Sequence, residues 1–327
     1  MSGRGLGFTG GTIDKLGAIP GFHVAMAYED FVKQVNSTGI AVTGQTGHIA
    51  PADKKIYALR DVTGTVDNLS LITSSIMSKK LAAGSDAILL DVKCGSGAFM
   101  KSEQDARRLA ELMVKIGSAA GKETVAVITD MDQPLGRAVG NALEVREAIQ
   151  VLKNEGPDDI TELSVKLAGT MVYLGGRASS LQEGEQKAAQ ALSDGSALQK
   201  FREFVAAQGG DPDITEDPGL LPSAEISEDL KAWCDGYIAG MDTMRIGLAS
   251  QHTGAGRETK DDEIDLSAGL YLHRKTGEYV RKGDVICTVY GNDVKKVGKA
   301  LEEVGNSVKI RNDKPEPQKL IKAVITV

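Results

Sequence analysis

The chain begins with a run of small and polar residues whose types suit anion binding. Between Ser2 and Thr12, five glycines are interspersed with hydroxyl and basic side chains. Glycine lets the backbone approach a ligand closely and adopt positive φ, so that successive N–H groups converge on one anion. Because serine and threonine add hydroxyl donors, the segment predicts a phosphate-binding loop, with a flexible glycine-rich start as the alternative.

Known phosphate motifs match this loop only in part. Gly5-x-Gly7-x-x-Gly10 has the spacing of a dinucleotide-binding fingerprint. That fingerprint needs a strand before it and a second strand ending in a carboxylate after it, and neither is indicated. A Walker A loop needs a lysine where Gly11 stands. The sequence therefore predicts neither a Rossmann unit nor a P-loop.

A second group of polar residues shares one face of a predicted helix. Spacings of three and four residues place an apolar floor, a hydroxyl and a cation side by side, at Ile72, Ser75, Ile76 and Lys79. Arg60, near the end of the preceding predicted helix, can be oriented toward Lys79. From this spacing alone, solvated surface charges and a space-filling serine are the more common interpretation.

The surrounding pattern predicts the elements that position these residues. Pro51 suits the first position of a helix whose apolar residues recur every three or four positions through Leu69. Asp67 or Asn68 can cap the next helix, which stops at Gly84. We expect these two helices to form part of a separate helical lobe.

A βαβ unit follows these helices. The continuous apolar run 87–92 is typical of a central parallel strand, Ser102 begins a helix with an S-x-x-D cap, and 124–130 is the next strand. Ligands of parallel sheets bind beyond the carboxyl ends of the strands. Lys93 and Asp130 stand at these ends and are therefore candidates for a site.

The rest of the chain completes an α/β fold with a smaller final domain. We expect a mostly parallel sheet flanked by helices, part of a helical lobe, and a C-terminal α+β domain of barrel-sandwich-like type. Further helices are predicted over 141–152, 158–174, 181–192 and 197–207, and short strands with glycine turns begin near 235. The expected divisions of the chain are 1–50, 51–84, 85–234 and 235–327.

The charge, hydrophobicity and cysteine content of the chain limit the partners and the location that it can have. The 327 residues carry a net charge of −7, which argues against nucleic acid or an anionic membrane as the main partner. No apolar run is long enough to span a bilayer. Cys94, Cys234 and Cys287 are spaced neither as zinc ligands nor as a disulfide framework. We therefore expect a cytoplasmic protein with free thiols and no membrane partner.

Several longer motifs, in order along nearly the whole chain, resemble those of the thymidine and pyrimidine-nucleoside phosphorylases. These motifs are Ser2–Leu16, Pro51–Thr63, Ser74–Lys80, Asp91–Lys93, Gly95–Met100, Asp130–Gly136, Gly254–Arg257 and Asp262–Leu266. The resemblance implies a pentosyltransferase that reversibly cleaves uridine, thymidine or deoxyuridine with phosphate. The products would be the free base and ribose or deoxyribose 1-phosphate. It implies no organic cofactor and makes inorganic phosphate the co-substrate.

The resemblance assigns roles to individual residues. It implies that Arg60, Ser75 and Lys79 hold the pyrimidine base through its carbonyl oxygens and ring nitrogen. Fixed cations at this place stabilise the negative charge on the departing base. The matching positions that line the base pocket are Leu6, Ile72, Ile76 and Phe99. The matching phosphate-binding positions are Ser2 and Thr12.

A monovalent cation, K⁺, is also implied by the resemblance. Leu135 and Ala138 match positions whose backbone carbonyls hold it, and Glu147 matches the carboxylate ligand. The alternative, that Glu147 is an ordinary residue of its helix, is nearly as well supported.

Members of this family carry a further N-terminal segment that supplies much of the helical lobe and the dimer contact. In this sequence Met1 directly precedes Ser2. We therefore expect a homodimer only if the lobe is complete, and activity impaired by the missing segment. Two alternatives stay open. One is a phosphoribosyltransferase resembling anthranilate phosphoribosyltransferase, which would depend on diphosphate and magnesium. The other is a non-catalytic truncated fragment.

Overall fold

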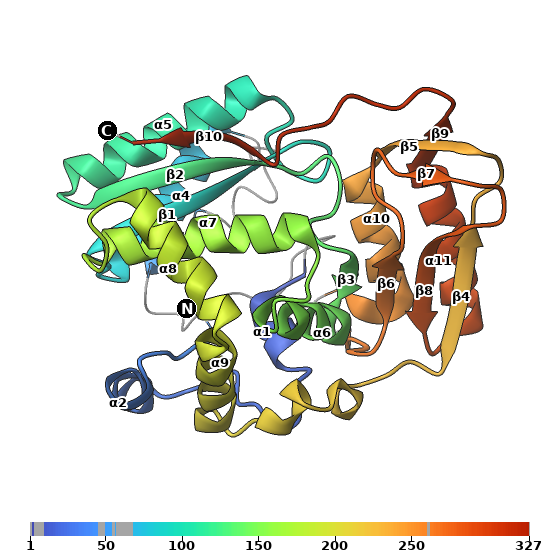
Figure 1. Ribbon diagram of the computed structural model, residues 1–327. Helices are drawn as coiled ribbons and strands as arrows, with labels where there is room; N and C mark the ends of the chain where they lie inside the picture. Colours follow the sequence, from blue (N-terminus) through green and yellow to red (C-terminus); the bar gives the residue numbers. More distant parts are fainter. Residues whose placement is uncertain are drawn as a thin grey trace. The chain divides into compact units, whose positions relative to one another are not determined.

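The computed structural model describes residues 2, 10–44, 50–53, 56, 68–259 and 262–326 (Figure 1). The chain divides into two compact units. The first unit comprises residues 1–44, 132–161 and 190–317, and the second comprises 45–131, 162–189 and 318–327.

The second unit is built on a three-stranded sheet. β1 (Ala87–Cys94) and β2 (Glu123–Asp130) pair in parallel, as the βαβ pattern predicts, and β10 (Ile321–Ile325) pairs antiparallel with β2. The α/β class is confirmed, and the sheet is mixed because β10 runs antiparallel to β2. Within the described residues, β1 lies at the edge, not in the predicted central place. Its side chains are accordingly buried in alternation, whereas those of β2 are nearly all buried.

Two helices pack on this sheet. α5 (Glu103–Ala119) connects β1 to β2 and contacts both strands and α4 (Leu69–Ala82). Both predicted helix starts are confirmed. Ser102 Oγ accepts a hydrogen bond from the Asp105 N–H at 3.1 Å, and Asn68 Oδ1 accepts one from the Leu71 N–H at 3.1 Å. Of the helix predicted from Pro51, the structure describes helical residues 51–53 and 56.

Two further predicted helices, α7 (Asp158–Leu174) and α8 (Leu181–Ser193), approach each other closely. The contact is made at two glycines, since a Cβ added at Gly184 would lie 2.2 Å from the Gly169 carbonyl oxygen. Lys166 and Glu185 form an ion pair of 2.6 Å beside this contact. The two glycines therefore set the distance between the helices.

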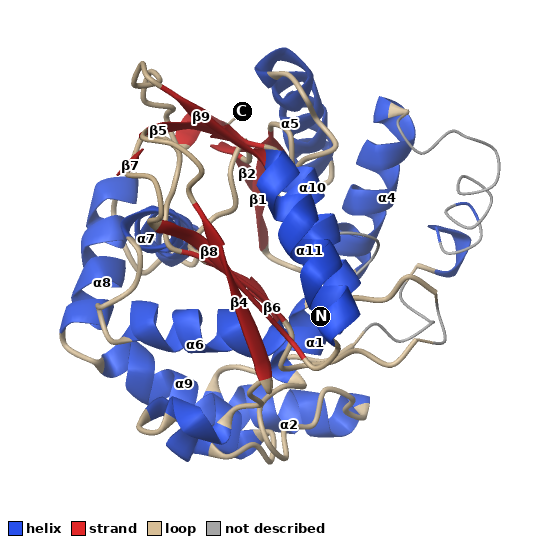
Figure 2. Cartoon of the chain, turned by 90° about the vertical axis from the view of Figure 1, so that its right-hand side faces the viewer, coloured by secondary structure: helices blue, strands red, loops and turns tan. Residues whose placement is uncertain are grey.

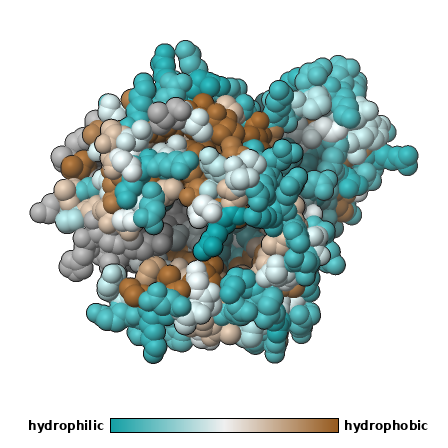
Figure 3. All heavy atoms as spheres, turned by 60° about the vertical axis from the view of Figure 1, so that its left-hand side comes forward, coloured by the Kyte–Doolittle hydropathy of each residue, from teal (hydrophilic) through white to brown (hydrophobic). Residues whose placement is uncertain are grey.

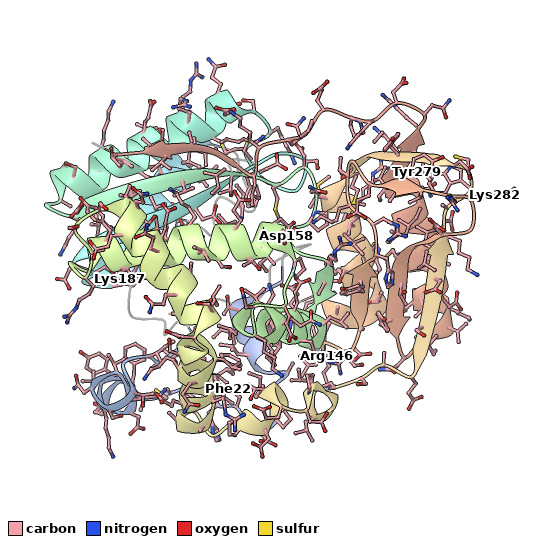
Figure 4. All side chains as sticks on the ribbon, viewed as in Figure 1. Phe22, Arg146, Asp158, Lys187, Tyr279 and Lys282 are labelled. Atoms are coloured by element: carbon pink, nitrogen blue, oxygen red, sulfur yellow. The ribbon has the colours of Figure 1, made fainter. Side chains whose placement is uncertain are left out.

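The first unit contains a helical layer. Its elements are α1 (Thr12–Leu16), α2 (Tyr28–Thr38), α6 (Asn141–Leu152), α9 (Ser196–Ala207), and the short 3₁₀ turns Pro212–Thr215 and Pro218–Leu220. α6 and α9 confirm predicted helices. Phe22 and Phe204 meet edge to face at 5.4 Å in the core of this layer. Arg146, on α6 (Figure 4), donates to the carbonyl oxygens of Leu221 and Pro222, which holds the chain leading to the C-terminal part.

The C-terminal part has the α+β character that the sequence predicts. One antiparallel sheet has the order β3 (Ala138–Gly140), β6 (Gly269–Leu272), β8 (Val285–Gly291), β4 (Ile226–Lys231). The other has the order β7 (Tyr279–Val280), β5 (Gly236–Met241), β9 (Val308–Arg311). α10 (Thr243–Ser250) continues into the π-helical segment Gln251–Ala255. It packs against α11 (Val294–Ser307), which covers β4 and β8 (Figure 2).

The surface drawn in Figure 3 is mostly hydrophilic, with apolar atoms gathered in a few patches. Among the described residues, no helix combines the length and the apolar character that crossing a bilayer requires.

Candidate active site

Two of the predicted base-binding residues are in direct contact on α4. Lys79 Nζ donates a hydrogen bond of 3.1 Å to Ser75 Oγ, one helical turn earlier, and forms an ion pair of 3.1 Å with Asp53 Oδ2. Ser75 is buried and Lys79 is half-buried, so neither is a freely solvated surface group. The third predicted residue, Arg60, lies outside the described residues.

Asp53 is a member of this cluster that the sequence analysis did not single out. It precedes Lys79 by 26 positions, so no helical periodicity connects the two residues. The sequence feature that could have indicated a role for Asp53 is its position in the Pro51–Thr63 motif. Its carboxylate balances the Lys79 ammonium and holds it in place.

The apolar residues predicted to line the base pocket differ in their surroundings. Ile72 and Ile76 are half-buried and pack against the core between α4, α5 and the sheet. Phe99 is 61% exposed, in the loop that follows β1. Leu6 lies outside the described residues. The two isoleucines are thus held by packing, whereas the Phe99 ring is open to contact.

Charged side chains gather at the carboxyl ends of β1 and β2, as the sequence predicts. Asp91 forms an ion pair of 2.7 Å with Lys93 and accepts a hydrogen bond of 2.5 Å from Thr129 Oγ1. Asp130 is buried and pairs with Lys322 of β10 at 2.9 Å. The contacts of Asp91 hold the end of β1, from which the loop carrying Phe99 begins.

The predicted phosphate loop is described at its two ends. Ser2 donates its N–H to the Thr43 carbonyl at 3.0 Å, and Thr12 is the exposed first residue of α1. The buried Asp14 of α1 accepts hydrogen bonds of 3.1 Å from both terminal nitrogens of Arg257. That contact joins the first motif of the chain to the motif Gly254–Arg257.

The three residues predicted to hold a cation belong to one small region around α6. Glu147 is 3% exposed, and its Oε1 accepts hydrogen bonds from the N–H groups of Arg137 (2.7 Å) and Ala138 (3.1 Å). Leu135 lies in the same loop, two residues before Arg137. Burial raises the pKa of the Glu147 carboxyl, and the two N–H donors act in the opposite direction.

The surroundings of Glu147 suit a cation. Gly136 has φ +68°, and a Cβ there would lie 2.1 Å from Glu147 Oε2, so only glycine lets the loop backbone pack this closely against the carboxylate. Two neighbouring carboxylates are already paired, Glu144 with Lys15 at 2.5 Å and Asp159 with Lys275 at 2.9 Å. Among the described residues, Glu147 forms no ion pair. Carboxylate and carbonyl oxygens are the ligands that hard cations prefer.

The predicted residues fall into two groups by unit. Ser75, Lys79, Ile72, Ile76 and Phe99 belong to the second unit, and Ser2, Thr12, Leu135, Ala138 and Glu147 belong to the first.

Comparison with protein families defines the class of this protein. Residues 1–198 match the glycosyl transferase family, a/b domain, and residues 237–311 match the pyrimidine nucleoside phosphorylase C-terminal domain. The first match, which includes β1, β2 and the candidate residues on α4, makes the chain a glycosyltransferase-type protein.

Individual relatives narrow the class. The chain is 51% identical over 326 residues to the pyrimidine-nucleoside phosphorylase of Staphylococcus haemolyticus (strain JCSC1435) and 52% identical over 326 residues to that of Bacillus subtilis (strain 168). Each alignment covers 100% of this chain and 75% of the relative. The Geobacillus stearothermophilus enzyme of the same name is 55% identical over 292 residues, 89% of this chain and 67% of the relative. The chain belongs to the pyrimidine-nucleoside phosphorylase family.

Proposed function

We propose that this chain catalyses the reversible phosphorolysis of uridine, thymidine and deoxyuridine, giving the free base and ribose or deoxyribose 1-phosphate. The observation that carries the proposal is the 51–52% identity over 326 residues to proteins named for this activity. The match of residues 237–311 to the C-terminal domain of the same enzymes disfavours the phosphoribosyltransferase alternative.

The α4 cluster supplies the groups that this reaction needs at the base. As the C1′–N bond breaks, its electron pair passes to the base, while a phosphate oxygen forms the new bond to C1′. The Lys79 ammonium, with Arg60, stabilises the negative charge on the base. Ser75 Oγ accepts from Lys79, so its own O–H can donate to a base carbonyl. The apolar positions Leu6, Ile72, Ile76 and Phe99 line the pocket in this proposal.

The first unit supplies the anion and cation sites of the proposal. Phosphate, the co-substrate, is bound at Ser2 and Thr12. K⁺ is bound by the carbonyls of Leu135 and Ala138 and by the Glu147 carboxylate. When bound, the cation supplies the positive charge that balances Glu147 and orders the loop between Pro134 and Ala138. The burial of the Glu147 carboxylate, which forms no ion pair among the described residues, supports this assignment.

A homodimer, a cytoplasmic location and the division of the chain after residues 50, 84 and 234 are parts of the same proposal. The cytoplasmic location is supported by the free thiols of the chain, of which Cys94 and Cys287 are buried. Size-exclusion chromatography with light scattering tests the dimer.

The proposed reaction is tested by measuring uracil and thymine release from uridine and thymidine with and without phosphate. We expect release that requires phosphate and yields one pentose 1-phosphate for each base. Product formation only with a phosphoribosyl diphosphate and Mg²⁺ would favour the transferase alternative. No release under either condition would overturn the proposed activity for this chain.

A further inference from the structure

Lys275 is a buried cation for which the proposed reaction provides no role. It lies in the turn between β6 and β7 and is 8% exposed. Burial lowers the pKa of its ammonium, and the adjacent Asp159 carboxylate raises it. An apolar side chain of similar length would avoid the cost of desolvating a charge. A lysine at this position is therefore explained by the hydrogen bonds that its three N–H groups donate.

The Lys275 ammonium donates two of its N–H groups to the loop 134–138 and the third to the Asp159 carboxylate. Nζ donates to the carbonyl oxygens of Pro134 and of Gly136, the latter at 2.7 Å, and pairs with Asp159 Oδ2 at 2.9 Å. The same Asp159 oxygen accepts the Gly136 N–H at 3.1 Å. The Pro134 carbonyl belongs to the peptide group before Leu135, and the Gly136 N–H that Asp159 accepts belongs to the peptide group that contains the Leu135 carbonyl. Lys275 and its partner Asp159 therefore fix together the two peptide groups that flank Leu135.

Glu147 holds the other end of the loop through the N–H groups of Arg137 and Ala138. The Lys275 ammonium thus binds the carbonyl oxygens of this loop, and the carboxylates of Asp159 and Glu147 accept hydrogen bonds from its N–H groups. Leu135 and Ala138, whose carbonyls are the proposed cation ligands, lie within this held segment.

We infer that Lys275 is the positioning residue of the cation site, holding the Leu135 carbonyl where it can bind K⁺ together with Ala138 and Glu147. This inference rests on the cation site of the proposed function. If Lys275 has this role, the C-terminal part of the chain contributes to the cation site. Lys275 itself touches neither the cation nor the substrate. Groups that orient metal ligands typically change metal affinity by about tenfold or more when removed.

The test is a titration of the melting temperature with KCl, with tetramethylammonium chloride keeping the ionic strength constant. The variant is Lys275→Met with Asp159→Asn, which removes one positive and one negative charge together. Because the net charge of the cluster is unchanged, the midpoint of the K⁺ response reports the loss of positioning. We expect this midpoint to rise about tenfold or more.

The matched control removes the neighbouring ion pair, Lys15→Met with Glu144→Gln, which contacts neither Pro134 nor Gly136. We expect its K⁺ midpoint to stay within about twofold of the unmodified protein. A structural role alone would lower the melting temperature of the Lys275 variant in tetramethylammonium without moving its K⁺ midpoint, and that result would overturn the inference. If the variant does not fold, Lys275→Gln is titrated instead, because glutamine is neutral and has two N–H donors, too few for both carbonyls and Asp159. An unchanged midpoint overturns the inference in the same way.

The cation site itself is tested separately by the unmodified protein and by Glu147→Gln. If K⁺ does not raise the melting temperature of the unmodified protein, the proposed cation site is wrong and Lys275 loses this role with it. If K⁺ does so, and Glu147→Gln abolishes the effect, the site stands and the Lys275 variant decides the inference alone.

Discussion

Ser75 Oγ and Lys79 Nζ lie 3.1 Å apart on successive turns of α4. The spacing of four residues aligns the two side chains on the helix surface, and Asp53 holds the ammonium from the other side. Ser75 and Lys79, two of the polar residues proposed to meet the base, are therefore ordered in the free protein. Groups that are ordered before the substrate arrives lose less entropy in the transition state.

Replacing the Lys79 ammonium should impair catalysis without unfolding the protein. We expect Lys79→Met to lower kcat/KM for uridine by about 100-fold or more, because a preorganised donor to a developing negative charge contributes about 3 kcal/mol. Lys80→Met is the matched control, since Lys80 is the next residue of α4 and is exposed. Equal losses in the two variants would contradict the assignment of Lys79 to the site.

Two glycines in helices should respond to alanine in opposite directions. Gly184→Ala places a Cβ 2.2 Å from the Gly169 carbonyl oxygen, so we expect a loss of about 1–3 kcal/mol in the free energy of unfolding. Gly298 of α11 has no heavy atom within 4 Å of a new Cβ, and alanine there should stabilise the protein by up to about 1 kcal/mol. Urea unfolding of both variants measures the difference. Destabilisation of equal size at both positions would show that the α7–α8 contact is not the cause.

The three thiols should differ sharply in reactivity. Cys234 is exposed, whereas Cys94 and Cys287 are buried, and burial raises the pKa of the Cys287 thiol to about 12. Because the thiolate is the reactive form, we expect one fast thiol per chain with a disulfide reagent under native conditions and three after unfolding. Cys234→Ser should remove the fast phase. A fast phase that persists in this variant would mean that a buried cysteine becomes exposed in solution.

Stability should fall as the solution becomes mildly acidic, with His273 contributing to the fall. Burial lowers the pKa of this imidazole below its usual value near 6.5, against a smaller opposing effect of Asp229. Below pH 6.5 the unfolded chain therefore binds the proton first, and the contribution of neutral His273 is lost as the pH falls toward the folded-state value. We expect His273→Gln to flatten this part of the profile when urea unfolding is compared at about pH 7.5 and about pH 5.5. An unchanged slope would assign the acid sensitivity to other groups.

The helices could be predicted where local signals agree. α6 and α7 match their predicted ranges because their apolar residues have helical periodicity and glycine or proline stands between them. β4 was not predicted, because its residues Ile226–Lys231 are mostly charged or polar. It forms a strand because it pairs with β8, and that partner lies about 60 residues later in the chain.

The site could be predicted from the sequence only in its local contacts. Ser75 and Lys79 are one helical turn apart, so their contact follows from helix geometry. Asp53 and Lys275 were missed because their partners lie 26 and 116 residues away. Such pairs are formed by the tertiary fold, and neither residue belongs to a periodic pattern that would indicate a partner.

The four-stranded antiparallel sheet of the first unit takes both of its outer strands from outside the stretch 237–311 that matches the C-terminal family domain. β3 (Ala138–Gly140) closes one edge and β4 (Ile226–Lys231) closes the other, while β6 and β8 lie within the stretch. A gene exchange confined to that stretch would transfer two inner strands and leave their edges open to other chains. The sheet is therefore complete only when the segments that carry β3 and β4 are present together with this stretch.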